Sequence, residues 1–329
     1  MVSLGCSINQ GDSEGLTPLH IAATHGYSSL AVLLLKAKAN YGARTTHGQT
    51  PLHLASMNNK AELVELLISV GANLDVVDSD GQTPLHLACI YNNPDVVICL
   101  LRLRADASLL DNKGNSALHH AVGTGHIVAD VVRELASACR TMLNVQNNNC
   151  DTPLHAAIRT HRKDDLAQVV ETLVELGSKE SVNCVSRLGH SALHLAVLER
   201  RLDLLRILLT AGASVNTLDH LRHTPLVSAA RANSIEETPY EVQVSQVSML
   251  LHAGARTRNL IQGGEIDDQV RDETVRQLIY NAMHHPPSLA GVCRRALSQY
   301  LGPQALVAMN NVILPTTWRE FLSFQSLSL

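Results

Sequence analysis

The stretch "GANLDVVDSDGQTPLH", Gly71 to His86, determines the fold of this 329-residue chain. A glycine able to end a helix opens the stretch, Asp and Gly suited to a turn follow, and Thr83-Pro84 stands near its end. Threonine caps a helix with its hydroxyl, and proline has the φ angle and missing N–H that a first helical turn tolerates. The stretch therefore predicts a helix end, a polar turn and a new helix start.

The start of this helix recurs at a nearly fixed interval. Successive starts lie 33, 33, 33, 36, 39 and 33 residues apart. They are TPLH at Thr17, Thr50, Thr83 and Thr152, SALH at Ser116 and Ser191, and TPLV at Thr224. A second apolar segment follows each start, such as "AELVELLISV" at Ala61 to Val70. A period of this length predicts a stack of helix pairs joined by turns.

The ends of the second helices carry a further signal. Gly71 and Gly212 stand where a left-handed residue is expected after the helix, whereas Lys38 and Arg104 take that place in two other repeats. A side chain in this conformation adds backbone strain of about 1 kcal/mol. The period is unaffected, so we expect these two repeats to keep the same fold at a small cost.

This pattern resembles the ankyrin repeat in its period, in the TPLHxA signature and in the turn-to-helix junction. The resemblance implies an all-α solenoid of about seven repeats over residues 1–258. Gly5, Asn9, Asp12 and Gly15 stand 66 residues before Gly71, Asp75, Asp78 and Gly81, which predicts a partial unit ahead of the first complete repeat.

The composition argues against several classes of function. The net charge of −4 gives no basic surface for nucleic acid and no polybasic run for a membrane. No run of apolar residues is long enough to span a bilayer, and no secretory signal begins the chain. The seven cysteines are scattered without a CxxC pair, which indicates a reducing, intracellular environment. The expected location is the cytoplasm, with the nucleus as an alternative.

The chain carries no recognisable catalytic or metal motif. Of its 17 histidines, six occupy one position of the repeat: His20, His53, His86, His119, His155 and His194. We attribute them to hydrogen bonds between neighbouring repeats. The pairs His119-His120 and His284-His285 lack a third ligand at zinc-like spacing, and "IQGGEI" is more typical of a linker than of a phosphate loop. We therefore expect neither an enzyme nor a cofactor or metal site.

Ankyrin stacks offer a concave face for binding other proteins, built from hairpin tips and the ends of the first helices. The candidate target-binding residues at those helix ends are Met57, Ile90, Tyr91, Arg159 and Leu198. An apolar centre with an arginine at its edge is a combination from which protein-binding hot spots are often built. A solvated face without a partner is the alternative for each residue taken singly.

The repeat period is lost after residue 258. In the segment 259–287, "EIDDQVRDETVRQLIYNAMHH" predicts a helix that closes the stack, followed by a linker at Pro286-Pro287. Beyond it, Ser288 is a suitable N-cap, and one helical stripe runs through Leu289, Val292, Cys293, Ala296, Leu297, Tyr300 and Leu301. So short a helix is marginal alone in water, so the stripe must pack against something. One alternative is that it merely caps the stack.

Residues 288–329 resemble a SOCS box, a small three-helix module. Its elongin-binding motif is a small residue, Leu, three residues, Cys, three residues and an aliphatic residue, which Ser288, Leu289, Cys293 and Leu297 match. The resemblance implies that this face, with Val292 and Ala296, binds elongin C, which pairs with elongin B. It also implies that Leu314-Pro315 recruits a cullin, usually of the cullin-five type, with its RING protein. Thr316-Thr317 stands where the family has a second proline, which leaves the choice of cullin open.

The whole chain thus resembles an ankyrin repeat and SOCS box protein. The family implies a non-catalytic substrate-recognition subunit of a cullin-RING ubiquitin ligase, which holds a protein target on its repeats. The alternative is an ankyrin scaffold or inhibitor that recruits no ligase.

Overall fold

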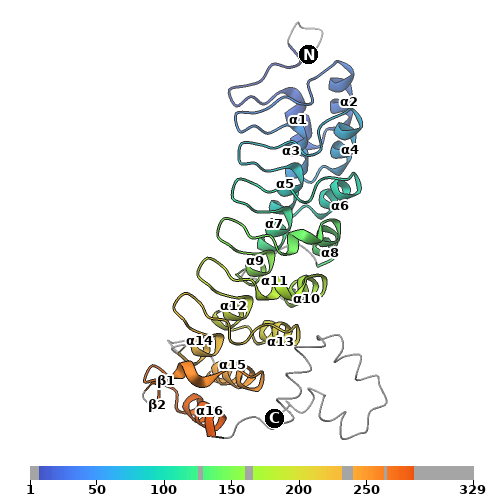
Figure 1. Ribbon diagram of the computed structural model, residues 1–329. Helices are drawn as coiled ribbons and strands as arrows, with labels where there is room; N and C mark the ends of the chain where they lie inside the picture. The colour runs from blue at the N-terminus through green and yellow to red at the C-terminus, as the bar shows by residue number, and fades with distance from the viewer. Residues whose placement is uncertain (1–6, 125–128, 160–165, 232–239, 263–264, 285–329) are drawn as a thin grey trace, which may run out of the picture. The chain divides into compact units, whose positions relative to one another are not determined.

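The computed structural model describes residues 7–124, 129–159, 166–231, 240–262 and 265–284 (Figure 1). The chain folds into two compact units, with the boundary between Gly177 and Ser178. The repeat period predicts no such boundary.

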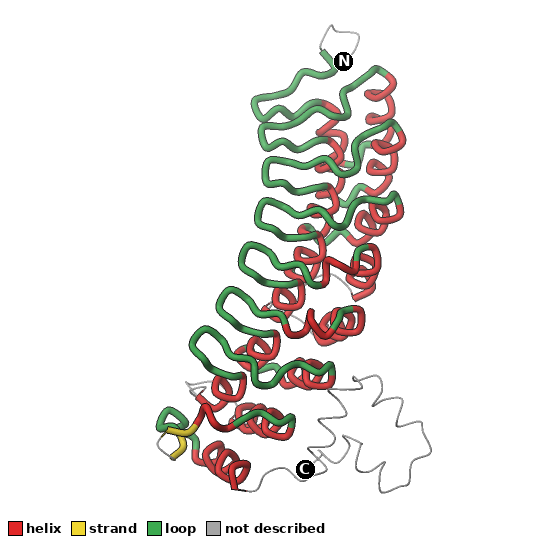
Figure 2. Tube along the Cα trace, viewed as in Figure 1, coloured by secondary structure: helices red, strands yellow, loops and turns green. Residues whose placement is uncertain are grey.

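In the first unit, five helix pairs stack, and a polar hairpin leads into each pair (Figure 2). The first helices of the pairs are α1 (Pro18–His25), α3 (Pro51–Met57), α5 (Pro84–Ile90), α7 (Ala117–Gly123) and α9 (Pro153–Arg159). The second helices are α2 (Ser28–Lys36), α4 (Ala61–Ser69), α6 (Pro94–Arg102), α8 (Ala129–Ala138) and α10 (Leu166–Leu176), and the 3-10 helix η2 (Arg140–Leu143) follows α8.

The second unit begins with the short helix α11 (Lys179–Asn183) and continues with two helix pairs and a closing helix. The pairs are α12 (Ala192–Leu198) with α13 (Leu202–Thr210), and α14 (Pro225–Arg231) with α15 (Tyr240–His252). The 3-10 helix η3 (Thr257–Leu260), the strands β1 (Ile261–Gln262) and β2 (Glu265–Ile266), and α16 (Glu273–His284) follow. Helix α12 packs on α14, α13 on α15, and α15 on α16.

The seven helix starts predicted from the repeat are confirmed, since each first helix begins directly after its Thr or Ser. The second helices are amphipathic: in α4, Leu63, Val64 and Leu67 are buried while Glu62 and Glu65 are not. Leucines at the second position of the first helices, such as Leu52, are also buried. Burial of these aliphatic faces, and not aromatic packing, therefore provides the core.

The recurring histidine connects neighbouring repeats within each unit. In α5, the Nδ1 atom of His86 accepts the backbone N–H of Thr83 at 3.2 Å, and its Nε2 atom donates to the carbonyl of Asn115 at 3.2 Å. The same pair of bonds, at 3.0 to 3.2 Å, occurs at His20, His53, His119 and His194. One neutral imidazole thus satisfies both a helix start and the following hairpin, as the sequence predicts.

The helix ends also follow the expectation. Gly71 and Gly212 have φ values of 98° and 84°, and Lys38 and Arg104 take the same left-handed conformation at 64° and 73°. Both side chains are exposed to solvent, so the cost of having no glycine there is the local backbone strain of about 1 kcal/mol and not a loss of core packing.

The segment after the last repeat differs from its prediction in two ways. The "IQGGEI" stretch, expected to be a linker, contributes the two short antiparallel strands β1 and β2, a small departure from an all-α fold. The closing helix begins at Glu273 instead of near Glu265. Asp267 and Asp272 cause this difference, because their carboxylates accept the backbone N–H groups of Gln269 and Val275 and so form a turn and a helix cap.

The buried histidines predict a loss of stability in mild acid. Burial lowers the pKa of His86 from 6.5 to about 4, and it also lowers the pKa values of His20, His53, His119 and His194. As the pH falls below 6.5, His86 becomes protonated in the unfolded chain but stays neutral in the folded chain. The free energy of unfolding therefore decreases until the pH reaches the folded-state pKa. We expect His86 alone to remove on the order of 1 kcal/mol by about pH 5.5. Urea unfolding at a series of pH values measures this, and a constant midpoint between about pH 7 and 5.5 would contradict it.

Two glycines of the second unit provide a matched test of hairpin packing. Gly189 and Gly212 have nearly equal φ values of 78° and 84°, but a Cβ atom at Gly189 would lie 2.7 Å from the backbone nitrogen of His220, whereas Gly212 has open space. We expect Gly212→Ala to lower the free energy of unfolding by about 1 kcal/mol. Gly189→Ala should cost about 1–3 kcal/mol more, because backbone must move. Equal changes in urea unfolding would show that the two hairpins are not held this closely.

Candidate protein-binding surface

The predicted target-binding residues occupy one structural position. Met57, Ile90, Arg159 and Leu198 are the last residues of α3, α5, α9 and α12, and Tyr91 directly follows α5. Leu198 belongs to the second unit and the other four to the first. Met57, Ile90 and Tyr91 come from neighbouring repeats whose first helices pack on each other, so the structure brings these three together.

These residues differ in what they offer to a partner. Tyr91 and Leu198 are exposed, with exposed fractions of 51% and 50%, whereas Met57 and Ile90 are less exposed and belong to the intermediate class between buried and exposed. The backbone at Met57 is also fixed, because its carbonyl accepts the side-chain amide of the buried Asn93 at 2.9 Å. Of the three predicted residues at the ends of α3 and α5, Tyr91 is therefore the most accessible. Met57 and Ile90 are less exposed, and the backbone of Met57 is held by Asn93.

Arg159 is not a free cation. Its Nη2 atom lies 3.4 Å from the Oδ1 atom of Asp151, the largely buried residue two positions before α9. An ion pair near the surface contributes little to stability, but it reduces the positive charge presented to a partner. The sequence pattern predicts the position of Arg159 correctly and does not reveal this pairing.

The equivalent position of the last repeat is Arg231, which is absent from the predicted set. Its Nη2 atom is paired with the Oδ2 atom of Asp267, and its Nη1 atom lies 2.8 Å from the Nε2 atom of His223. The backbone N–H of Gln269 and the Arg231 guanidinium hold the pKa of Asp267 below its ordinary value. The repeat register alone would have placed Arg231 among the predicted target-binding positions, since it stands seven residues after Thr224, as Met57 does after Thr50.

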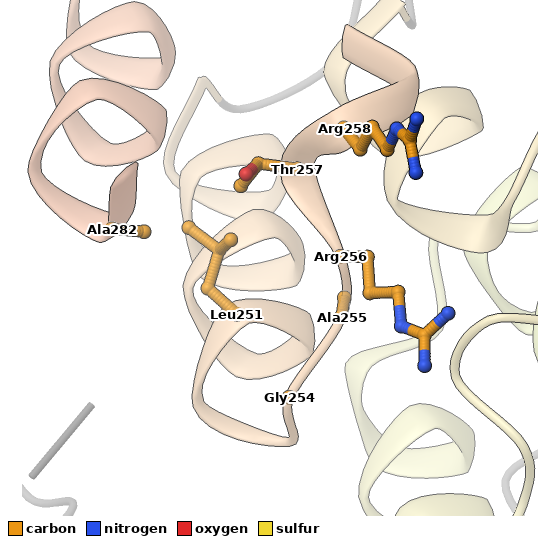
Figure 3. A pocket seen from close by; sticks show the side chains of 7 residues that line it. All are labelled: Leu251, Gly254, Ala255, Arg256, Thr257, Arg258 and Ala282. Atoms are coloured by element: carbon orange, nitrogen blue, oxygen red, sulfur yellow. The ribbon is translucent and has the colours of Figure 1, made fainter. Parts of the chain in front are cut away.

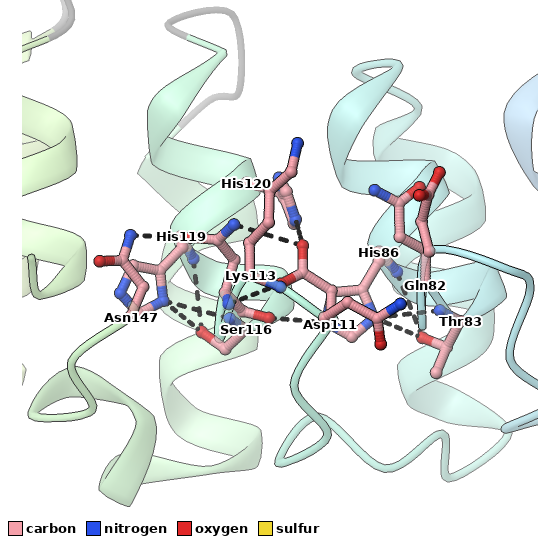
Figure 4. Close-up of polar contacts among 12 residues, drawn as sticks. Gln82, Thr83, His86, Asp111, Lys113, Ser116, His119, His120 and Asn147 are labelled. Atoms are coloured by element: carbon pink, nitrogen blue, oxygen red, sulfur yellow. Dashed lines mark hydrogen bonds and ion pairs between the residues drawn. The ribbon is translucent and has the colours of Figure 1, made fainter. Parts of the chain in front are cut away.

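A polar cluster in the first unit replaces an apolar repeat position. His120 stands where α3, α5 and α12 carry leucine, and its Nε2 atom lies 2.8 Å from the Oδ2 atom of the buried Asp111 (Figure 4). Asp111 also accepts the backbone N–H groups of Lys113 and Asn115 at 2.9 and 2.7 Å. Although burial by itself raises the pKa of Asp111, the bonds from Asn115 and His120 lower it overall. Its bonding is satisfied, so the cluster is structural.

A shallow hollow of about 300 Å³ lies in the second unit between α15, η3 and α16. Its apolar side is formed by Leu251 and Ala282, and Figure 3 shows the side chains of Arg256 and Arg258 directed away from these two. Among the described residues, no carboxylate or histidine lines the hollow. The described lining therefore holds no carboxylate or imidazole for acid–base catalysis.

Within residues 7–284, apart from the gaps given above, no group of three or more His, Cys, Asp or Glu residues could hold a metal ion. No helix in the described ranges is long and apolar enough to cross a membrane. The predicted elongin-binding and cullin-binding residues, Ser288 to Leu297 and Leu314-Pro315, lie outside the described residues.

Similar proteins agree with the repeat architecture. The chain is 35% identical over 135 residues to the nuclear factor NF-kappa-B p105 subunit of Rattus norvegicus, and 30% identical over 105 residues to that of Gallus gallus. It is 32% identical over 85 residues to a putative ankyrin repeat protein of Acanthamoeba polyphaga mimivirus. These matches cover 40%, 32% and 26% of this chain but only 13%, 11% and 11% of the relatives.

The family pattern described as ankyrin repeats in three copies matches four overlapping stretches, at residues 19–111, 58–139, 92–179 and 161–255. Together they cover well over half of the chain and span the seven helix pairs described above. A stack of such repeats presents an extended surface that suits contact with another protein. The chain belongs to the ankyrin-repeat family.

Proposed function

We propose that this protein is the substrate-recognition subunit of a cullin-RING ubiquitin ligase. Its repeats hold a protein target, and its C-terminal segment binds elongin C, elongin B and a cullin with its RING protein. The chain performs no covalent chemistry. It acts in the cytoplasm by raising the effective concentration of the target near the ubiquitin-conjugating enzyme.

The observation that carries this proposal is the sequence of residues 288–297. Ser288, Leu289, Cys293 and Leu297 match the elongin-binding motif, and the last three share one predicted helical stripe. Leu314-Pro315 follows, and the whole segment stands behind a family-matched set of ankyrin repeats. In such a helix-in-groove contact, Leu289 is the anchor and Cys293 serves as a small apolar group.

A second function, an ankyrin scaffold or inhibitor without ligase recruitment, is supported by the repeats alone. The family match ends at residue 255. The stretches of this chain that are similar to the NF-kappa-B p105 subunits are 105 and 135 residues long. On this alternative the stripe at Leu289, Cys293 and Leu297 would only cover the end of the stack. Binding of elongins distinguishes the two functions.

We expect the full chain, co-expressed with elongins B and C, to purify with both of them. Leu289→Ser combined with Cys293→Phe should reduce the recovered elongins about tenfold or more, because it removes the anchor and overfills its neighbour. Arg295→Ser with Gln299→Ser changes the opposite face of the same predicted helix and is the matched control. Equal recovery from all three proteins, or none from any, would exclude the ligase function.

The cullin contact makes a separate prediction. With elongins B and C bound, we expect the chain to retain a cullin of the cullin-five type on a size-exclusion column. Leu314→Ala with Pro315→Ala should weaken this retention while leaving the elongins bound, because the two contacts use different segments. Preference for another cullin would show that Thr316-Thr317 changes the choice and would leave elongin binding untouched.

A further inference from the structure

The second unit carries a row of exposed aliphatic side chains on two neighbouring hairpins. Val185 and Leu188 lie on the hairpin 184–191 before α12, with exposed fractions of 37% and 57%. Leu218 and Leu221 lie on the hairpin 217–224 before α14, with 45% and 74%. Since the two pairs stand 33 residues apart, they occupy the same two positions in successive repeats.

The two hairpins are held against each other. The backbone N–H of His220 donates to the carbonyl of Leu188 at 3.1 Å, and the absence of a side chain at Gly189 lets the backbone of Asp219 and His220 approach. Figures 1 and 2 show the hairpins before α12 and α14 side by side. The four aliphatic side chains therefore lie on two hairpins whose backbones are in contact, and together they are called the apolar strip.

The fold does not require leucine at the hairpin tips. At the position of Leu188 and Leu221, the hairpins of the first unit carry Glu14, His47, Asp80, Lys113 and Asn149, all polar. Their backbones form the same turn, with the next residue in the left-handed conformation. A position that accepts a charged side chain without loss of the turn gains nothing from leucine in a molecule that has no partner there. The two leucines therefore indicate contact with another molecule.

The charges around the strip indicate its chemistry. Arg187 and Arg222 are exposed beside the leucines, and Asp219 is the only carboxylate in the two hairpin sequences. Asp219 is buried: it accepts the backbone N–H of His223 at 2.7 Å and lies 3.8 Å from the Nε2 atom of His190. Its charge is therefore turned away from solvent. The strip is thus apolar with a positive edge.

We propose that the strip formed by Val185, Leu188, Leu218 and Leu221, with Arg187 and Arg222 at its edge, binds an acidic protein segment that carries large apolar side chains. The apolar groups of that segment cover the leucines, and its carboxylates meet the two arginines. This inference rests on the proposed function in one respect, namely that the repeats hold a protein target. It adds where on the repeats the target is held and what kind of segment is recognised.

The test is selection of peptides from a phage-displayed random library on the full-length protein. We expect enriched peptides that combine Asp or Glu with Leu, Ile or Phe. A synthetic peptide of the enriched sequence should bind Leu188→Ser with Leu221→Ser at least about tenfold more weakly than the parent protein. Arg187→Glu with Arg222→Glu should also weaken binding and remove its dependence on salt.

The matched control is Val77→Ser with Leu110→Ser, which removes two aliphatic side chains of similar exposure, 42% and 44%, from hairpins of the first unit. The tips of those hairpins carry Asp80 and Lys113, so we expect unchanged peptide binding. All variants alter exposed residues and should unfold at the same urea concentration as the parent protein.

Three results would overturn the proposal. They are no enrichment of any peptide, enrichment of peptides without acidic residues, or equal affinity of the enriched peptide for the parent protein and for the double variant Leu188→Ser with Leu221→Ser. A fourth is a change from dimer to monomer in that variant, measured by light scattering, since the strip would then bind a second copy of the chain. Elongin capture by the same variants separates the two proposals. Loss of peptide binding with elongins retained concerns the strip alone, and failure of the parent protein to bind elongins concerns the ligase function alone.

Discussion

The interaction on which this structure depends is the paired hydrogen bond of the recurring histidine. At His20, His53, His86, His119 and His194 the imidazole accepts the backbone N–H of its own Thr or Ser and donates to a carbonyl of the next hairpin, as His86 does between Thr83 and Asn115. Both bonds require a neutral ring with its proton on Nε2. Burial, which lowers the pKa of the ring, keeps it neutral, so the packing that buries the histidine also preserves its bonding pattern.

Because, within each unit, backbone groups and one side chain hold neighbouring repeats together, other positions are free to vary. The hairpin tips show this most directly, since the same turn carries Asp80 in the first unit and Leu221 in the second. The ends of the first helices vary in the same way, from the half-exposed Tyr91 to Arg231, which is paired with Asp267. A regular framework thus leaves two series of positions on which recognition can be built.

The two proposals use different parts of the chain for different purposes. The segment that resembles a SOCS box would bind the same elongins whatever the target, whereas the strip at Leu188 and Leu221 would select the target. A linker between two proteins needs surfaces and no reactive centre.

The sequence by itself determined the repeat period, all seven helix starts and the left-handed ends at Gly71, Gly212, Lys38 and Arg104. These features are local, since a cap, a proline or a positive φ depends on a few consecutive residues. Only the tertiary structure decided that Met57 and Ile90 are half-buried, that Arg159 is paired with Asp151, and that the closing helix begins at Glu273. Burial and pairing depend on groups that are far apart in the sequence and that folding brings together, such as Arg231 and Asp267. The repeat period describes positions within one repeat and does not predict such pairings.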